Sequence, residues 1–575
     1  MDRNLILSII LSVLIIVGFQ YFFHSFSPPT HVNAPSKTEI PKKSKSGEKH
    51  AVDGTKSISE SAVRESEVAS IKTPSEPGKY KSANATVKES RITVDTPNYR
   101  AILSNFGGKI VSFNLKRYTT HIGSPDLVNL FPPEGPDTSG PSIRLTRSDE
   151  VFSDSNLAYS FDPNDSEIRV DKTGDSRTLV FKSVSESGLV VYKKFTFHAD
   201  TYSIDLTYGF ENTTGKARDY LVTFPLRKFF TQDPHQRFSW DSVLILLDGS
   251  LKDYDFKSIK GDEELSGQVA WAGLGDVYFF KALVFSDKPA GKVTLLKPTK
   301  DDIAEILVRY GSLEVPAGGK SAETKIGLYL GPKEANDLQA AGGDLNRALV
   351  YSNYQALNYM STYLMKFLRF SYSGFTVFGV KVPGTGNYGI DIIILTLLIK
   401  ILFIPLTHKS MKSMKRMQDL QPQIAKLKEK YKDDKTALNK ATMELFRDNK
   451  VNPLGSCWPM FLQIPVFIAL YQALSYAIEL RHAPFLCLPS IYFCIRDLSA
   501  PDPYYVTPIL MGGTMVLQQW MTPSAGDPTQ KKMMLLMPVV FTYMFLSFPS
   551  GLVLYWLVSN MLSIGQQLIT NRLTR

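Results

Sequence analysis

The spacing of hydrophobic residues divides this chain of 575 residues into an alternating middle part and an apolar C-terminal part. In the stretch "TYSIDLTYGFEN", hydrophobic residues fall at every second position, as in a half-buried strand: Ile204, Leu206, Tyr208 and Phe210. The stretches "RTLVFKSV", "LVVYKKFTFHA" and "DIAEILVRY" are also strand candidates, with Gly, Asn and Asp turns between many of them. Because no regular strand–helix alternation occurs, we predict a large antiparallel β-sandwich domain over residues 91–340.

A helical pattern follows the strands, in "ALNYMSTYLMKFLRF". One helical stripe contains Leu357, Met360, Leu364, Phe367 and Ser371. The cations Lys366 and Arg369 lie away from this stripe. The pattern predicts an amphipathic helix over residues 355–372 that lies in a membrane interface. The alternative is a helix packed on the β domain.

Long apolar stretches, typical of membrane-spanning helices, dominate the rest of the chain. Five of them cover residues 388–407, 455–477, 504–520, 533–548 and 551–569. A sixth, residues 5–23, is longer than the usual core of a signal peptide, and no A-x-A cleavage site follows it. We therefore expect an uncleaved anchor over residues 1–26, rather than a cleaved signal peptide, and a five-helix core over residues 386–575.

The segment between the anchor and the β domain, residues 27–90, has a different composition. It is rich in Ser, Lys, Glu and Pro, and no aromatic residue occurs between Phe26 and Tyr80. Such a segment cannot bury enough apolar surface to offset the conformational entropy of its chain. We predict a flexible linker.

The basic charge of the chain, formally +10 with a pI of about 9.1, is compatible with nucleic acid or with an anionic membrane surface. Its distribution favours the membrane. If Arg3 keeps the N-terminus in the cytoplasm, the β domain lies outside and residues 409–452 lie inside, with 12 Lys and Arg against 6 Asp and Glu. The outer loop 478–503 has only Arg481 and Arg496 as Lys or Arg, in agreement with the positive-inside rule. Both termini are then cytoplasmic.

The cytoplasmic segment 409–452 has its own periodicity. Hydrophobic residues recur at helical spacing on both sides of the turn "KDDK": Met411, Met414, Met417, Leu420, Ile424, Leu427 and Tyr431, then Leu438, Ala441 and Leu445. This pattern predicts an antiparallel helical hairpin. The methionines belong either to the core of the hairpin or to an adaptable apolar surface for other protein segments.

Lys400 is a charge in the middle of an apolar span. Such a charge costs about 2.5–3.5 kcal/mol on insertion scales. The four later spans contain no Asp or Glu, and Asp391 is nine residues away. Lys400 is therefore expected to lack a charged partner, and we infer a hydrated pocket that is open to the cytoplasm. A lysine that extends to the interface and has no functional role is the alternative.

Other polar residues of the spans are candidates for lining this pocket. They are Thr396, Gln463, Gln518, Ser559, Asn560 and Ser563. Hydrogen bonds between helices are an alternative explanation for several of them. Together with an unpaired lysine, they favour a pocket that accepts a hydrophilic peptide stretch partway into the membrane.

The sequence contains no strong catalytic motif. The spans have no His–Glu pair, no GxSxG and no nucleotide loop, and CxxC zinc spacing is absent. The stretch "GGKS" (Gly318–Ser321) fails as a phosphate loop, because the first glycine of GxxxxGKS would fall on Glu314. We expect no enzyme activity, no cofactor and no bound metal.

Four long motifs resemble the YidC family of membrane-protein insertases, which is related to the Oxa and Alb branches. They are "KVNPLGSCWPMFLQIPVFIALYQAL", "ELRHAPF", "DLSAPDPYYVTPILMG" and "FPSGLVLYWLVSN". The order of anchor, linker, β domain, amphipathic helix and five-span core looks like a Gram-negative member. The resemblance implies an insertase and chaperone of the inner membrane, with a periplasmic β domain, that works without nucleotide hydrolysis, alone or with the Sec translocon.

The resemblance also implies roles for particular residues. Lys400 matches the basic position of the family's groove, where most members have arginine, and Thr396, Gln463 and Tyr555 match groove-region positions. The third and fifth spans would form a slide for client helices, with Phe461, Leu462, Phe467, Met537 and Phe541. The implied partners are nascent membrane proteins, the Sec translocon, the lipid bilayer and, at the basic cytoplasmic face, the ribosome or the signal-recognition machinery. We expect no specific nucleic acid.

The loop "LCLPSIYFC" looks like an insertion relative to familiar members of the family. If it lies outside the membrane, Cys487 and Cys494 face an oxidising compartment. They could then form a disulfide that closes a short loop, and two free thiols are the alternative.

Two other classes of function compete with an insertase. A transporter or channel with Lys400 as an anion site would be favoured by an intramembrane acid pair or an inverted repeat, and the sequence shows neither. An enzyme acting on lipids or envelope polymers through the β domain would need a concave site with paired acids, which spacing alone does not reveal.

Overall fold

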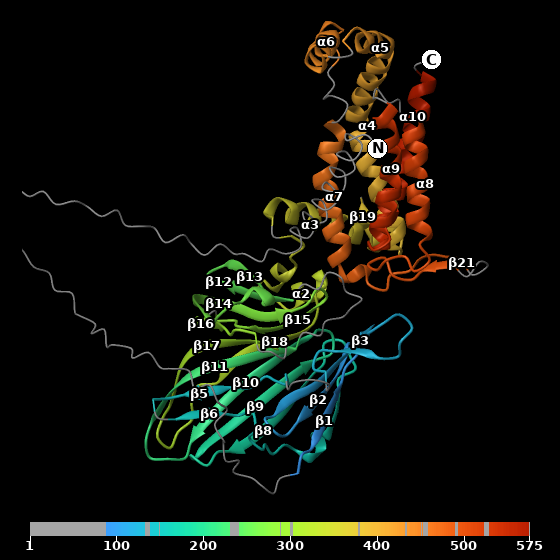
Figure 1. Cartoon of the computed structure of the whole chain (residues 1–575). Coiled ribbons are helices and arrows are strands. Elements are labelled where there is room, and N and C mark those ends of the chain that lie inside the picture. Colours follow the sequence, from blue (N-terminus) through green and yellow to red (C-terminus); the bar gives the residue numbers. More distant parts are fainter. Residues whose placement is uncertain are drawn as a thin grey trace, which may run out of the picture.

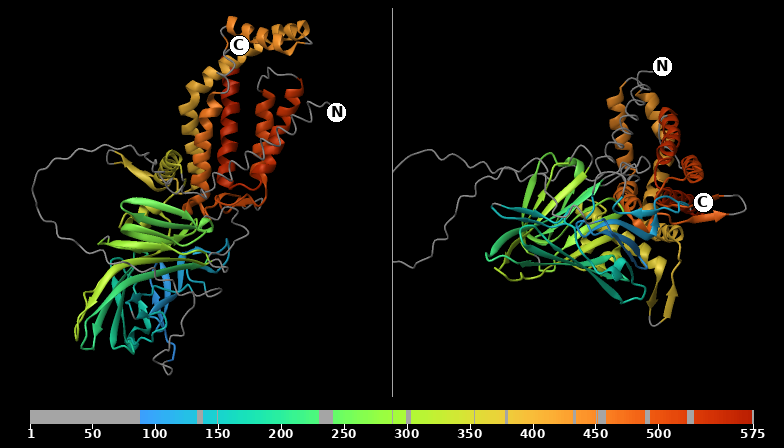
Figure 2. Two further views of the ribbon diagram at one scale, coloured as in Figure 1. Left: turned by 60° about the vertical axis from the view of Figure 1, so that its left-hand side comes forward. Right: turned by 90° about the horizontal axis from the view of Figure 1, so that it is seen from below.

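The computed structural model describes residues 88–573, with gaps at 133–137, 149, 230–240, 288, 299–302, 353, 378–379, 432–433, 450, 452–457, 489–492 and 522–527 (Figure 1). The expected anchor 1–26 and nearly all of the linker 27–90 lie outside the described residues. The described residues form a β domain at one end and a bundle of helices at the other (Figure 1 and Figure 2, left).

The first sheet of the β domain has five strands in the order β4-β3-β2-β1-β7. They are β1 (Arg91–Asp95), β2 (Tyr99–Ser104), β3 (Lys109–Thr119), β4 (Leu127–Asn129) and β7 (Glu167–Arg169). The pair β1–β7 is parallel, so the prediction of an antiparallel domain is wrong for this pair. The chain between these strands passes through β5 and β6 of the other sheet, and such a long crossover can return a strand in the same direction.

The second sheet has thirteen strands and contains the stretches predicted from alternation. Its strands are β5 (Arg144–Thr146), β6 (Val151–Ser153), β8 (Ser176–Val184), β9 (Leu189–His198), β10 (Ser203–Asn212), β11 (Arg218–Phe229), β12 (Ser242–Leu247), β13 (Ser250–Asp255), β14 (Glu263–Gly275), β15 (Phe279–Val284), β16 (Ala290–Leu295), β17 (Ile303–Val315) and β18 (Thr324–Pro332). Strand β14 pairs with β16 through its first half and with β12 and β15 through its second half. All four alternating hydrophobic residues of β10 are buried, which confirms its predicted inward face.

One hydrophobic core joins the two sheets. The ring of Tyr99 in the first sheet stacks on Phe113 at 4.4 Å and lies 6.4 Å from the ring of Tyr202, next to β10. Below them, Lys193 Nζ lies 3.1 Å from Asp154 Oδ2, and both side chains are fully buried. The predicted β-rich domain is therefore confirmed as two sheets packed on a shared core.

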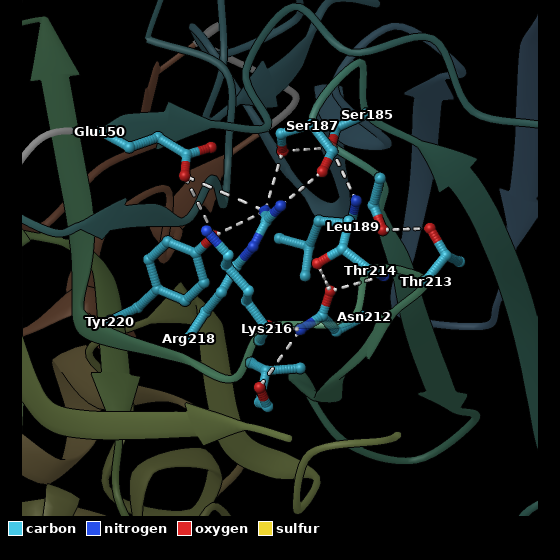
Figure 3. Close-up of polar contacts among 12 residues, drawn as sticks. Glu150, Ser185, Ser187, Leu189, Asn212, Thr213, Thr214, Lys216, Arg218 and Tyr220 are labelled. Atoms are coloured by element: carbon cyan, nitrogen blue, oxygen red, sulfur yellow. Dashed lines mark hydrogen bonds and ion pairs between the residues drawn. The ribbon is translucent and has the colours of Figure 1, made fainter. Parts of the chain in front are cut away.

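A polar cluster fastens the loops at one end of this domain (Figure 3). The guanidinium of Arg218 donates to the carbonyl of Ser187 at 2.6 Å and to the hydroxyl of Tyr220 at 3.1 Å, and Tyr220 donates to Glu150. Nearby, Gly318 N donates to Thr214 O at 3.0 Å. The segment "GGKS" thus forms the turn between β17 and β18, and no helix follows it as a phosphate loop requires.

The rest of the described chain is mainly helical. Its elements are α2 (Ala335–Ala340), α3 (Gln355–Ser373), β19 (Gly374–Val377), β20 (Val380–Pro383), α4 (Tyr388–Asp419), α5 (Gln421–Lys430), α6 (Lys435–Asp448), α7 (Trp458–Tyr476), β21 (Phe485–Leu488), β22 (Phe493–Ile495), α8 (Val506–Met521), α9 (Pro528–Phe545) and α10 (Ser550–Leu573). Helix α10 packs against α4, α7 and α8, and α8 packs against α9. Among the described helices, α4 and α10 are long and apolar enough to cross a membrane, while α7 and α9 contain shorter apolar stretches.

Helix α3 uses its faces differently from the prediction. Ser361, Met365 and Leu368 are buried against the bundle, and Ser361 Oγ donates to Ala469 O of α7 at 2.9 Å. Leu357, Leu364 and Phe367 of the predicted stripe pack at the edge of the same core, while Tyr359 and Tyr363 are exposed. The helix is therefore packed on α7 and α4, and its free face is aromatic.

The segment 409–452 is broken into shorter helices than its periodicity suggested. Helix α4 continues to Asp419, and α5 begins at Gln421 with Pro422 in its first turn. The predicted first arm is thus two helices with a break at Leu420, because proline fits a helix start better than a helix interior. Leu420, Ile424 and Val451 form a small core there, with Met417 packed against it.

The β domain meets the helices at the loop that follows α7. Arg481 donates to the carbonyls of Thr119 and Thr120 at 2.8 and 2.9 Å, and its guanidinium lies 5.7 Å from the ring centre of Tyr278. Beside it, the buried Glu479 accepts from Arg369 Nε of α3 at 2.8 Å. The motif "ELRHAPF" therefore joins the β domain, α3 and the C-terminal end of α7.

Candidate functional site

Lys400 lies in the fourth turn of α4, and the start of this helix is well defined. The side chain of Asn387 caps it by accepting from the backbone N–H groups of Gly389 and Ile390. In the first turn, Asp391 accepts from the hydroxyl of Thr385 at 2.7 Å and is fully buried. These contacts fix where α4 begins and hence the height of Lys400 within the bundle.

The ammonium of Lys400 contacts the last helix. Its Nζ donates to Ser563 Oγ at 2.7 Å, and Ser563 Oγ in turn donates to Ser559 O at 2.9 Å. Within the described residues no carboxylate oxygen lies within 4 Å of this ammonium, as expected from the lack of acids in the later spans. The sequence alone indicates water as the remaining partner of this ammonium. The structure adds a hydroxyl from a residue 163 positions away.

Helix α10 carries further polar contacts on the side of Lys400. Gln463 Nε2 of α7 donates to the hydroxyl of Tyr555 at 3.3 Å, and Gln566 Nε2 donates to Thr407 Oγ1 of α4 at 2.7 Å. Tyr555, Ser563 and Gln566 recur at helical spacing, so they share one face of α10. This polar face of α10 lies against α4 and α7, and α4 and α10 are the two described helices that are long and apolar enough to cross a membrane.

A second polar face of α10 points toward α8. Asn560 Nδ2 donates to Thr514 Oγ1 at 3.3 Å, and Gln567 Nε2 donates to Met521 O at 2.7 Å. Thr396 differs again, because its buried hydroxyl donates to Ile392 O of its own helix. The seven predicted groove residues, including Gln518 on α8, are therefore spread over at least two faces of the bundle. The sequence prediction missed Thr407, Gln566, Thr514 and Gln567. Their helical spacing from the predicted residues is a signal that they share the same polar faces.

The predicted slide residues divide into exposed and interior positions. On α7, Phe461 and Leu462 are 57% and 44% exposed. Phe467 is buried, with its ring 4.8 Å from that of Trp556, and this differs from the expectation of a client-facing surface. On α9, Met537 is half-buried and Phe541 packs at 6.1 Å from Trp556. The aromatic residues therefore bind α7, α9 and α10 to one another, and the outer rows of α7 remain open.

The two cysteines of the loop between α7 and α8 are paired in the structure. Cys487 in β21 and Cys494 in β22 are joined by a disulfide across the short hairpin. Cys487 is exposed at the surface. The hairpin packs against the start of α4, where a side chain added at Gly389 would collide with Phe485.

Known proteins share both parts of this architecture. A family model described as 60Kd inner membrane protein matches residues 380–575, and one described as YidC periplasmic domain matches residues 91–363. A curated relative named membrane protein insertase YidC, from Citrifermentans bemidjiense, is 39% identical and covers 84% of this chain and 85% of its own length. A relative of the same name from Syntrophus aciditrophicus is 37% identical and covers all of both chains.

A solved structure described as an active YidC insertase with its first transmembrane domain resolved is also similar. It is 18% identical, covers 83% of this chain and 92% of its own, and gives a TM-score of 0.35.

Proposed function

The chain belongs to the YidC family of membrane protein insertases, and on this premise we propose that it inserts and helps to fold membrane proteins through the polar face of α10. The family is one of inner-membrane proteins with a periplasmic domain, and its name describes an insertase and not an enzyme. Lys400 carries the proposal, because its ammonium lies inside the helical bundle with a hydroxyl partner and without a carboxylate among the described residues.

The chemistry of this face suits a hydrophilic client segment. A cation and several neutral donors and acceptors can replace part of the hydration of a peptide tail, which lowers its free energy in the membrane. Lys400, Gln463, Tyr555, Ser563 and Gln566 offer such groups between α4, α7 and α10. Because these contacts lower the free energy of the segment in the membrane, its entry needs no nucleotide hydrolysis. We propose that the groove is hydrated and open to the cytoplasm.

Exposed apolar side chains give a route for the hydrophobic part of a client. Phe461 and Leu462 on α7 and Leu536 and Val539 on α9 are each more than two-fifths exposed. We propose that a client helix moves along these rows into the lipid while its polar tail occupies the groove. Interior rings such as Phe467 hold α7, α9 and α10 together beneath these rows.

The placement of exposed aromatic residues supports a multi-pass topology. Trp520 at one end of α8 is 82% exposed, and Tyr543 near the far end of its neighbour α9 is 79% exposed. Tryptophan and tyrosine favour the two water–membrane interfaces. We propose six spans, with an anchor at 1–26, a linker at 27–90, a periplasmic domain at 91–340, an interfacial helix at 355–372, a core at 386–575 and both termini in the cytoplasm.

The hairpin of α5 and α6 is the proposed contact with the translation machinery. It lies beyond the cytoplasmic end of α4 and belongs to the segment with 12 Lys and Arg against 6 Asp and Glu. Such charge attracts ribosomal RNA or anionic lipid. Cooperation with the Sec translocon is proposed on the same family premise.

The experiment uses the purified full chain in liposomes without nucleotide or other translocon components. A small single-span client is added, and protease protection of its translocated tail is scored. We expect protection above empty liposomes, retained by Lys400→Arg and lost by Lys400→Glu. The matched control is Lys409→Glu, which makes the same charge change at an exposed position nine residues further along α4. Equal protection by the parent, Lys400→Glu and Lys400→Ala would refute the role of the groove charge.

A further inference from the structure

A small cavity opens in the β domain, away from the helices, where β3, β5, β6 and β11 approach one another. Its volume is about 70 Å³. One water needs roughly 10–15 Å³ on this scale, so the space suits a group of about five heavy atoms.

The lining of the cavity is rich in positive charge and hydroxyl groups. Its cations come from three different strands, and they are Lys109, Arg144 and Arg227. Ser142, Ser153 and Ser155 add hydroxyl groups, and the described lining contains no Asp or Glu. Such a wall offers many donors to an acceptor-rich ligand and little that would repel an anion.

Arg144 is the uncommitted cation of this wall. It is half-buried, and it makes no side-chain hydrogen bond or ion pair within the described part of the chain. By contrast, Arg227 pairs with Glu305 at 3.0 Å. The antiparallel register of β5 and β6 places Arg144 opposite Ser153, and both line the cavity. A guanidinium held at the edge of a cavity presents a planar fork that matches phosphate or carboxylate oxygens.

A buried lysine lies behind the same wall. Lys281 is 1% exposed, and its ammonium lies 3.7 Å from the ring centre of Phe131 and 3.5 Å from the carbonyl of Arg227, both of which line the cavity. Burial, together with the nearby charge of Lys228, holds the pKa of Lys281 well below its usual range. The carboxylate of Asp276 opposes this shift only in part, because it is paired with Lys228 at 2.7 Å. An anion in the cavity would further offset the cost of a charge on Lys281.

We propose that this cavity binds a small tetrahedral oxyanion of the phosphate class, with Arg144 as its main ligand. The hydroxyls of Ser153, at the end of β6, and of Ser155, two residues further on, add contacts opposite Arg144. These two hydroxyls are hydrogen-bonded to each other at 3.1 Å. The same chemistry is presented by inorganic phosphate and by a phosphate ester such as a lipid headgroup. The site is separate from the polar face of α10 and does not depend on the insertase activity.

The test is calorimetric titration of the full chain, in detergent free of phosphate groups, with inorganic phosphate at constant ionic strength. We expect saturable binding to one site, weakened at least tenfold by Arg144→Gln. The matched control is Arg177→Gln, which removes the same charge from an exposed residue of β8 and should leave the affinity unchanged. Arg144→Lys should give an intermediate affinity, because it keeps the charge and loses the fork.

Thermal unfolding of each variant without phosphate checks that the β domain is folded. Absence of saturable binding to the folded parent would overturn the proposal, and so would equal weakening by Arg144→Gln and Arg177→Gln. Glycerol phosphate then distinguishes a site for phosphate esters from a site for the free phosphate ion. Competition with inorganic phosphate would extend the supported site to esters, whereas failure to compete would restrict it to the free ion.

Discussion

Replacing Ser563 tests whether the position of the Lys400 ammonium matters for insertion. The Ser563→Ala change removes the hydroxyl that accepts from Lys400 at 2.7 Å and donates to Ser559 O at 2.9 Å. A hydrogen bond to a charged group contributes about 1.5–3 kcal/mol. Both side chains are half-buried, so water replaces part of the lost contact and we take the lower value. Since roughly 1.4 kcal/mol corresponds to tenfold, the ammonium should occupy its native position about ten times less.

The assay is the initial rate of client protection in proteoliposomes containing equal amounts of folded protein. We expect Ser563→Ala to slow insertion by about three- to tenfold and Ser563→Thr to preserve most of the rate, since threonine keeps a hydroxyl at that position. Ser373→Ala is the matched control, because Ser373 also donates to the carbonyl four residues earlier, Arg369 O at 2.8 Å, but contacts no ammonium among the described residues.

A double-mutant cycle identifies the route of the effect. If Ser563 acts through Lys400, adding Ser563→Ala to Lys400→Met should produce no further loss of rate. The reasoning is refuted if the two losses add in full, or if folded Ser563→Ala inserts clients at the parental rate.

Three further predictions concern the β domain and the loop between α7 and α8. Lys281→Met should raise the free energy of unfolding by about 1–3 kcal/mol near pH 7, measured by phosphate-free urea titration. Burial lowers the pKa of Lys281 in the folded state, so the cost of its charge to stability is fully present below that pKa. The stability gained by the substitution should therefore shrink as the pH rises toward 10. No change at any pH would contradict this. In protein from an intact periplasm, thiol labelling before reduction should modify Cys457 and neither Cys487 nor Cys494, and labelling of all three would rule out the disulfide. Arg481→Ala removes the two hydrogen bonds to the carbonyls of Thr119 and Thr120, and the loss of roughly 1.4 kcal/mol should speed amide hydrogen exchange around Thr120 about tenfold. Arg496→Ala, at an exposed residue of the same loop, should leave this exchange unchanged. Equal exchange rates in both variants would show that Arg481 does not hold the β domain.

Local periodicity was sufficient to find four strands of the β domain and most of the helices. Alternation identified β8, β9, β10 and β17 because side chains of a strand point alternately to two faces, whatever the neighbouring strand is. The absence of acids in the later spans likewise predicted that Lys400 would have no carboxylate beside it, since that is a matter of composition. The family motifs are also a property of the sequence alone.

Packing between distant segments decided the rest. The partner of Lys400 is Ser563, and nothing in the spacing of either helix shows that these two turns lie side by side. Periodicity located α3 but could not show that α7 would cover Met365 and leave Tyr363 exposed. The parallel β1–β7 pair and the cavity around Arg144 likewise arise where strands from separate parts of the chain meet. A residue's own neighbours in sequence determine its local conformation, whereas its contacts depend on which elements share a core.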